Sequence, residues 1–264
     1  MPDPAANPTG LAAYRPADVA RRIEEAGVAK ADLAFLPLAT LGVLAGAFIS
    51  FGALAFTSVM TGADLAHGPT RFLGGIAFSL GLILVIVGGA ELFTGNALIV
   101  MAWVDGRVRL PAMLRNWSIA FFANFAGALA LVLLVHATGL LQGPMGVTAA
   151  KIAMAKASLG LIEAFARAVL CNALVCLAVW LTFAGVSATD KILAIVWPVA
   201  AFVLIGGEHS IANMYFIPVG WLAGAPIDWA SATAGLAAVT VGNIVGGVGG
   251  VALSYWLAYR HTRA

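Results

Sequence analysis

The chain has 264 residues, of which 62% are hydrophobic and 10% are charged, whereas a soluble domain has about 25% charged residues. This composition excludes an ordinary soluble enzyme and is too apolar for a disordered chain. The formal net charge of +2 is small and dispersed along the chain, so the sequence gives no indication of a nucleic-acid partner.

Six apolar runs are long enough to cross a bilayer, for which a helix needs about 20 residues. In chain order they are residues 33–62, 72–104, 116–135, 159–183, 192–222 and 231–259. Glu91 interrupts the second run, and Glu208 and His209 interrupt the fifth. We therefore predict an all-α membrane protein with six transmembrane helices, of which spans two and five are broken. The predicted transmembrane domain is 33–259, between an N-terminal tail at 1–32 and a C-terminal tail at 260–264.

Basic residues fall mainly on one side of the predicted bilayer. The two tails and the connections after spans two and four contain most of them. The opposite side has Arg71, Lys151 and Lys156. The positive-inside rule therefore predicts that both termini lie in the cytoplasm.

The N-terminal tail contains one segment with helical periodicity, at residues 17–31. Val19, Ile23 and Ala26 are spaced as on one face of a helix, and Pro16 stands where a helix can begin. This pattern predicts a short amphipathic helix on the cytoplasmic surface. A solvated helical tail with no role fits the same pattern, and the sequence leaves both interpretations open.

The two predicted broken spans resemble each other. Each has a Gly-Gly pair followed by a glutamate, Glu91 or Glu208, and an asparagine five residues later, Asn96 or Asn213. Two related halves with three spans each must be inserted in opposite directions, because three is an odd number. We therefore predict two inverted three-helix repeats.

Ionisable residues inside the predicted spans need partners, because a charge at the centre of a span costs about 2.5–3.5 kcal/mol. This applies to Glu91, Glu208 and Lys156. For the two carboxylates we favour a structural role, in which they accept backbone N–H bonds at the loose helix ends. For His209 we favour a function in the pathway over a satisfied core histidine, because an ionisable group within a span is functional by default.

Small residues recur every four positions in two spans, and such ridges let helix backbones approach closely. They are Gly42, Gly46 and Ser50 in span one, and Gly242, Gly246 and Gly250 in span six. Glu163 and Arg167, four residues apart in span four, are expected to neutralise each other.

The chain shows no pattern for a metal or a cofactor. Its four histidines have no spacing that suits metal ligands. Cys171 and Cys176 are five residues apart, which places them on different faces of a helix, so we expect neither a disulfide nor a metal site. We expect no cofactor, and we expect that the protein is not an enzyme.

Three segments resemble a known family. The segments at 89–96 (GAELFTGN) and 208–214 (EHSIANM) resemble the two signature segments of the formate/nitrite transporter family, and 172–180 (NALVCLAVW) resembles its fourth span. The resemblance implies a homopentamer of aquaporin-like protomers in a bacterial inner membrane. Each protomer would have its own pore for small monovalent weak-acid anions, with formate as the first expectation, nitrite as the second, and proton coupling.

The resemblance also implies roles for particular residues. Thr94 and His209 would meet at the pore centre, with a polar network behind the histidine. That network would contain Glu208, Lys156, Asn172 and Asn213. The apolar constrictions on either side would be formed by Phe78, Leu82, Phe93, Val175 and Phe202. Arg167 does not follow from the family pattern, and its role stays open.

An anion that enters an apolar constriction loses its water, so its charge must be paired or neutralised. His209 can hold a proton near neutral pH and can attract the anion or protonate it. Lys156 would concentrate anions at the entrance. A hydrosulfide or short-chain carboxylate channel stays an alternative. A neutral-solute channel of aquaporin type is more remote, because the chain has no Asn-Pro-Ala box.

Overall fold

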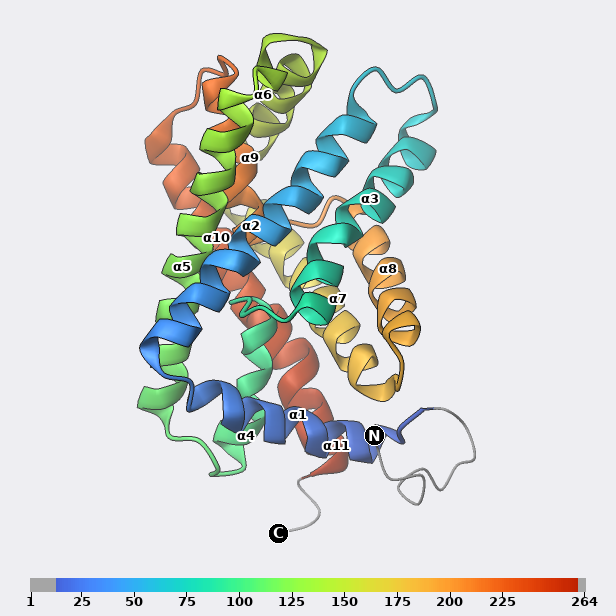
Figure 1. Ribbon diagram of the computed structural model, residues 1–264, viewed down its shortest axis with the longest axis vertical. Helices are drawn as coiled ribbons and strands as arrows, with labels where there is room; N and C mark the ends of the chain where they lie inside the picture. Colours follow the sequence, from blue (N-terminus) through green and yellow to red (C-terminus); the bar gives the residue numbers. More distant parts are fainter. Residues whose placement is uncertain (1–12, 261–264) are drawn as a thin grey trace.

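The computed structural model describes residues 13–260, which form a bundle of helices with no β-strand in that range (Figure 1). Within it, five helical segments are long and apolar enough to cross a membrane. They are α2 (Phe35–Met60), α3 (His67–Gly88), α5 (Leu110–Ala137), α7 (Leu161–Ala184) and the segment Trp229–Tyr259. This last segment consists of α10 (Trp229–Gly247), a π-helical stretch η4 (Val248–Leu253) and α11 (Ser254–Tyr259).

The second and fifth predicted spans are interrupted where the sequence predicts. After α3, Gly89 has a positive φ of 83°, and helical structure resumes only in η2 (Gly95–Ile99) and α4 (Val100–Val104). The fifth run divides into α8 (Ala188–Leu204) and α9 (Ser210–Leu222), with Gly206 at φ 77° between them. The 13 residues of α9 are too few to cross a bilayer alone, and the 17 of α8 are at the lower limit of the length needed.

One helix was not predicted. The connection between spans three and four contains a short η3 (Leu140–Gln142) and α6 (Pro144–Ala157), which includes Lys156. The small side chains of Ala149 and Ala153 let α6 approach α9, where a Cβ added to Gly220 would lie only 2.2 Å from the Cβ of Ala153. Hydropathy did not reveal α6, because it has 14 residues and two lysines and is too short for a span.

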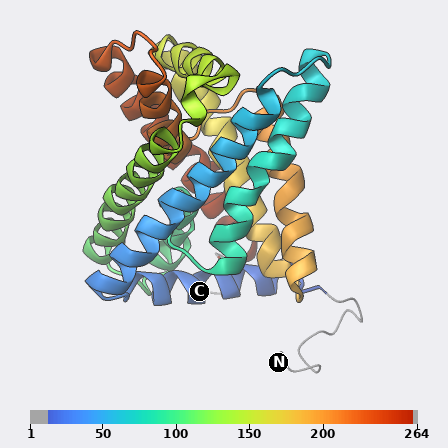
Figure 2. The same cartoon turned by 45° about the horizontal axis from the view of Figure 1, so that its top comes forward.

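The predicted amphipathic helix is present as α1 (Pro16–Ala31). It lies across the ends of the other helices, on the same side as α4 and α11, whereas α6 lies at the opposite end (Figure 1, and turned in Figure 2). Val19, Ala20 and Ile23 are buried to 2% exposure or less. The interpretation of this segment as a solvated tail is therefore wrong. We call the two ends of the bundle the α1 face and the α6 face.

The small-residue ridges form close backbone contacts, as predicted. A Cβ added to Gly46 of α2 would lie 1.9 Å from the carbonyl oxygen of Asn124, and one added to Gly246 of α10 would lie 2.2 Å from that of Val169. There is no room for a side chain at these distances. The packing of α2 against α5 and of α10 against α7 therefore requires glycine at these positions.

Of the two tails, the structure describes only a part. Residues 1–12 and 261–264, which form parts of the two predicted tails, lie outside the described residues. Arg260 is the one residue of the predicted C-terminal tail that is described.

Candidate functional site

The two broken segments meet at one contact. The hydroxyl oxygen of Thr94 lies 2.9 Å from Nε2 of His209, and the two residues are 1% and 3% exposed. Thr94 directly precedes η2, and His209 directly precedes α9. Each residue therefore stands where a half-helix begins, and the structure brings them together as the resemblance implies.

The hydrogen bonds of His209 determine which ring nitrogen carries the proton. Nδ1 accepts the backbone N–H of Ala212 at 3.1 Å, which makes His209 the N-cap of α9. A nitrogen that accepts cannot carry a hydrogen, so the neutral ring has its proton on Nε2. Nε2–H therefore donates to the hydroxyl of Thr94. A second proton on Nδ1 would displace the capping N–H.

Behind His209, the Glu208 carboxylate is bound by two side chains. Nζ of Lys156 lies 3.0 Å and 2.9 Å from its two oxygens, and Nδ2 of Asn213 donates to Oε2 at 2.8 Å. Glu208 is 4% exposed. Its charge is therefore neutralised by a lysine from α6.

Asn172 is not part of this network. Its Nδ2 donates to the backbone oxygens of Thr94 at 3.2 Å and Asn243 at 2.6 Å. The expectation of a single network with Glu208 is wrong for this residue, because α7 places its amide beside the backbone of the other broken segment. Asn172 positions Thr94 instead.

A matching network binds Glu91 near the α1 face. Nζ of Lys30 lies 2.5 Å from one carboxylate oxygen, and Nδ2 of Asn96 donates to the other at 2.9 Å. Lys30 was not among the residues predicted for the site. The signal that could have found it is spacing, because Lys30 and Lys156 each lie five residues before the long helix that follows.

One asparagine binds the backbone at each of the two interrupted segments. Asn124 donates to the carbonyl oxygens of Gly42 and Glu91 and accepts the N–H of Phe93. Asn243 forms the same three bonds, with the carbonyl oxygens of Ala168 and Glu208 and the N–H of Ser210. These amides satisfy backbone groups that a broken helix leaves open.

The expected capping role of the two glutamates is therefore wrong. Among the described residues, the hydrogen bonds to the carboxylates of Glu91 and Glu208 come from lysine and asparagine side chains. Asparagine amides and the His209 ring take the backbone N–H groups instead.

A cavity opens on each side of the Thr94–His209 contact. The cavity at the α6 face has a volume of about 180 Å³, and its lining includes Phe78, Phe202 and His209. The cavity toward the α1 face has a volume of about 390 Å³, and its lining includes Leu82 and Glu91. Phe78 lines the first cavity and Leu82 lines the second, and the two residues are four apart on α3, which is about one helical turn.

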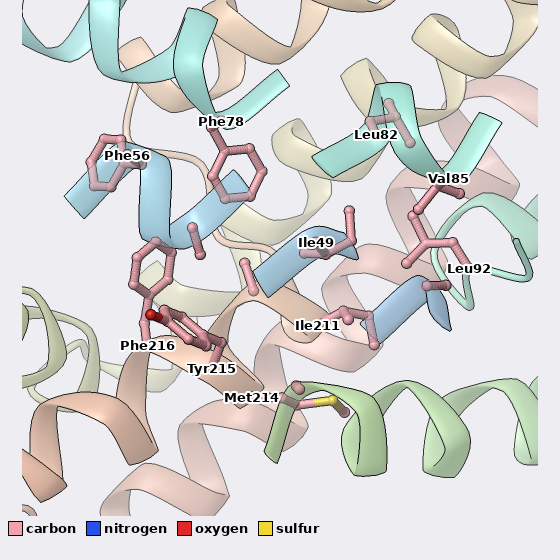
Figure 3. Close-up of a cluster of buried hydrophobic side chains, with 14 of the residues drawn as sticks. Ile49, Phe56, Phe78, Leu82, Val85, Leu92, Ile211, Met214, Tyr215 and Phe216 are labelled. Carbon is pink, nitrogen blue, oxygen red and sulfur yellow. The ribbon is translucent and has the colours of Figure 1, made fainter. Parts of the chain in front are cut away.

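Aromatic rings line the α6-face cavity next to His209. The rings of Phe78 and Phe202 meet edge to face at 5.7 Å between centroids, and Phe202 stacks on His209 at 6.3 Å. Figure 3 shows Phe78 facing the rings of Phe56 and Phe216, with Leu82 and Val85 farther along α3.

The other two expected constriction residues, Phe93 and Val175, are buried in the same apolar cluster as Phe78, Leu82 and Phe202. The ring of Phe93 packs against Phe121 at 5.1 Å and Trp117 at 6.2 Å, and it lines neither cavity. Val175 is 2% exposed within the apolar core and also lines neither cavity.

The remaining predictions concern span four. Nη2 of Arg167 lies 2.5 Å from Oε1 of Glu163, so the expected ion pair is confirmed. Cys171 and Cys176 are buried free thiols. Arg71, which the sequence analysis counted only as a loop charge, lines the α6-face cavity together with Arg167.

Comparison with known proteins agrees with this geometry. The sequence model of the family described as "Formate/nitrite transporter" matches residues 17–257. The formate channel FocA of Escherichia coli (strain K12) is 40% identical, with 92% of this chain and 94% of FocA covered. A probable formate transporter of Methanothermobacter thermautotrophicus is 39% identical, covering 92% and 96%.

Two solved structures have the same fold. A pentameric formate channel with formate bound superposes with a TM-score of 0.80 at 38% identity, covering 85% of this chain and 97% of that chain. An ion channel of the FNT family gives a TM-score of 0.83 at 27% identity, covering 91% and 98%. The chain therefore belongs to the formate/nitrite transporter family.

Proposed function

We propose that this protein conducts small monovalent weak-acid anions across a membrane, formate first and nitrite second, with proton coupling through His209. The observation that carries the proposal is the Thr94–His209 contact, which lies between two cavities and behind an apolar barrier. The named formate channels among the relatives support the choice of substrate.

The barrier formed by Phe78, Phe202 and Leu82 is costly for a charge, because an anion there has lost its water and finds no ion to pair with. Next to this barrier, the Nε2–H of His209 donates to the hydroxyl of Thr94. An anion oxygen can take the place of the Thr94 hydroxyl and accept that bond. A weak acid that also gains the proton crosses as a neutral molecule.

Proton transfer has a structural consequence. To give a proton from Nε2 and remain neutral, His209 must first be an imidazolium with protons on both nitrogens. The second proton, on Nδ1, displaces the N–H of Ala212 and opens the cap of α9. We propose that this state is transient. Loss of the Nε2 proton to the anion leaves the neutral ring protonated on Nδ1, so the cap closes again only when Nδ1 releases its proton and Nε2 takes up another.

The two halves support an inverted repeat of six crossings with an aquaporin-like arrangement. In this proposal α1–α5 correspond to α6–α10, because Lys30, Glu91, Asn96 and Asn124 form the same bonds as Lys156, Glu208, Asn213 and Asn243. The α3 and η2–α4 pair then makes one interrupted crossing, and the α8 and α9 pair makes the other.

We further propose that the protein is a homopentamer in a bacterial inner membrane with the α1 face in the cytoplasm. Apolar side chains on the outside of the bundle suit contact with lipid or a neighbouring protomer, among them Ile162 at 87% exposure and Phe122 at 68%. The solved pentameric formate channel supports the number of protomers. The distribution of basic residues supports the orientation.

The test is transport in liposomes with a trapped pH indicator. An inward formate or nitrite gradient is expected to change the internal pH faster in vesicles with the protein than in vesicles without it. Glycerol is the control solute, since a neutral-solute channel speeds glycerol-driven swelling and leaves the pH response unchanged. That result would overturn the proposal.

A further inference from the structure

The α6-face cavity contains one cation that no carboxylate neutralises. Arg71, Lys156 and Arg167 line it. Lys156 bonds to both oxygens of Glu208, and Arg167 pairs with Glu163. Within residues 13–260, Arg71 forms no ion pair. The positive charge that remains in this cavity is therefore that of Arg71.

The Arg71 side chain is held in place by neutral groups. Its Nε and Nη2 donate to the carbonyl oxygen of Val203 at 3.2 Å and 3.0 Å. Val203 belongs to the last turn of α8, where the helix dipole is negative and favours a cation. These bonds orient the guanidinium without cancelling its charge, and they leave its Nη1 without a hydrogen bond in the described part of the chain.

Arg167 reaches the same point from α7. Its Nη1 donates to the carbonyl oxygen of Gly206 at 3.3 Å. A Cβ added to Gly206 would lie 3.1 Å from Nη1 of Arg167 and 3.7 Å from Nη2 of Arg71. Two guanidinium groups therefore flank one glycine at the end of α8. Gly206 lies two residues before Glu208 and three before His209.

We propose that Arg71 and Arg167 form an anion-binding site at the α6-side mouth of the pathway, for a small planar anion with two oxygens such as a carboxylate or nitrite. Guanidinium donors lie in a plane and suit the two oxygens of such an anion. This inference rests on the proposed function and deepens it. It assigns the attraction of anions to Arg71 and replaces the expectation that Lys156 supplies it.

The site also explains how dehydration is divided into steps. The Val203 carbonyl that holds Arg71 belongs to the residue after Phe202, whose ring forms the barrier and stacks on His209. An anion bound at the guanidinium pair is thus directly before the aromatic barrier. It can exchange part of its water for guanidinium donors before it meets the phenyl rings.

The first experiment compares Arg71→Gln with Lys151→Gln. Lys151 is an exposed cation of α6 that does not line the cavity, so the two variants lose the same charge at the same face. Formate uptake into proteoliposomes is measured against formate concentration at low and high salt. At low salt, Arg71→Gln is expected to raise the half-saturating concentration about five- to tenfold with little change in maximal rate. At about 1 M salt the difference between Arg71→Gln and the wild type should shrink, because the Debye length is then only about 3 Å.

Arg71→Lys separates charge from structure. Because lysine keeps the positive charge, Arg71→Lys should recover most of the low-salt affinity. It should do so even though lysine loses the two-nitrogen contact with Val203. The proposal is overturned if Arg71→Gln retains the wild-type half-saturation, if Lys151→Gln loses as much, or if Arg71→Lys is as impaired as Arg71→Gln at both salt concentrations.

A binding measurement keeps this inference distinct from the proposed function. Phenylglyoxal modifies accessible arginines, and mass spectrometry gives the rate at each one in the purified pentamer. Formate is expected to slow modification of Arg71 but not of the exposed Arg109, which lies outside both cavities. Protection of Arg71 without formate flux would overturn the proposed function alone. Flux without protection would overturn the anion site alone.

Discussion

Lys30 and Lys156 form equivalent ion pairs on opposite sides of the pathway. Lys30 of α1 binds Glu91 at 2.5 Å, and Lys156 of α6 binds Glu208 at 2.9 Å. In each case a short helix that lies against a half-helix brings a lysine to the glutamate of a broken segment. The two lysines neutralise buried carboxylates. We therefore expect that replacing either lysine lowers the stability of the protein as its main effect.

Lys156→Ala is expected to destabilise the protein by about 3 kcal/mol, because it leaves the buried Glu208 without a counter-charge. Thermal unfolding of the detergent-solubilised oligomer measures this loss. Adding Glu208→Gln to Lys156→Ala should recover much of it. Lys30→Ala should cost less, since the Lys30 side chain is 32% exposed and that of Lys156 is 15% exposed. A Lys156→Ala oligomer of wild-type stability would contradict the prediction.

Gly246→Ala should destabilise the protomer, since the new Cβ would lie 2.2 Å from the carbonyl oxygen of Val169. Gly235 is the matched control on the same helix, α10, because a Cβ there meets nothing within 4 Å. Gly235→Ala should be neutral or stabilising by up to about 1 kcal/mol, as alanine favours a helix more than glycine does. Size-exclusion elution and melting temperature compare the two variants. Equal behaviour would show that α7 and α10 are not in close backbone contact.

His209→Asn tests proton coupling with little disturbance of the fold. Asparagine is a good N-cap, so its side-chain oxygen can still accept the N–H of Ala212, while the titrating ring is gone. Formate uptake should lose its coupling to internal pH. The variant should either conduct formate as an anion without a proton or conduct no formate at all. Proteoliposome flux is measured at several pH values in parallel with the wild type. Unchanged flux with unchanged proton coupling would remove His209 from the mechanism.

Asn172→Ala should reduce transport without breaking the Lys156–Glu208 pair, because Asn172 bonds to the backbone of Thr94 and not to Glu208. Loss of that bond leaves Thr94 less well placed beside His209. Uptake and melting temperature are measured together, with Asn213→Ala for comparison. Asn213 donates directly to Glu208, so its loss should act on the carboxylate network. Identical profiles for the two variants would indicate one shared network after all.

The docking of α1 should depend on pH through Glu24. Burial raises the pKa of this carboxyl above 4.5, although bonds and charges from Arg260 and the charge of Arg107 oppose the shift. A raised pKa in the folded state means that the docked helix prefers the protonated form. The resulting stability is therefore fully present below the unfolded pKa and is lost as pH rises through the folded pKa.

Hydrogen exchange of α1, corrected for the intrinsic pH effect, measures this dependence. Protection should fall as pH rises from about 4.5 through the raised pKa of Glu24. Glu24→Gln should remove the trend, and Glu25→Gln on the exposed side of the same helix should keep it. A trend that persists in Glu24→Gln would assign it to another group.

Local sequence patterns predicted the features that depend on neighbours in the chain. Long apolar runs determine the membrane-crossing helices, and a Gly-Gly pair before a glutamate marked both interruptions. The Glu163–Arg167 pair followed from one helical turn of separation. His209 was identified because an ionisable ring is out of place in an apolar span.

The features that were missed depend on residues far apart in the chain. Lys30 is 61 residues from Glu91, and Arg71 is 132 residues from Val203. Neither partner is visible to a pattern read along one segment. Helix α6 was missed for a different reason. It is stabilised by the packing of small alanine side chains against α9 and not by a long apolar face.

The contact between Glu24 and Arg260 has a consequence for biosynthesis. Glu24 lies in the first described helix, and the arginine that binds it at 2.8 Å is 236 residues later. Synthesis at about 5–20 residues per second separates the two by ten seconds or more. During that interval α1 has left the ribosome, and its buried carboxylate has Arg107 at 3.5 Å as a partner but does not yet have Arg260. The first described helix can therefore complete its ion pairs only after the segment Trp229–Tyr259 has been translated.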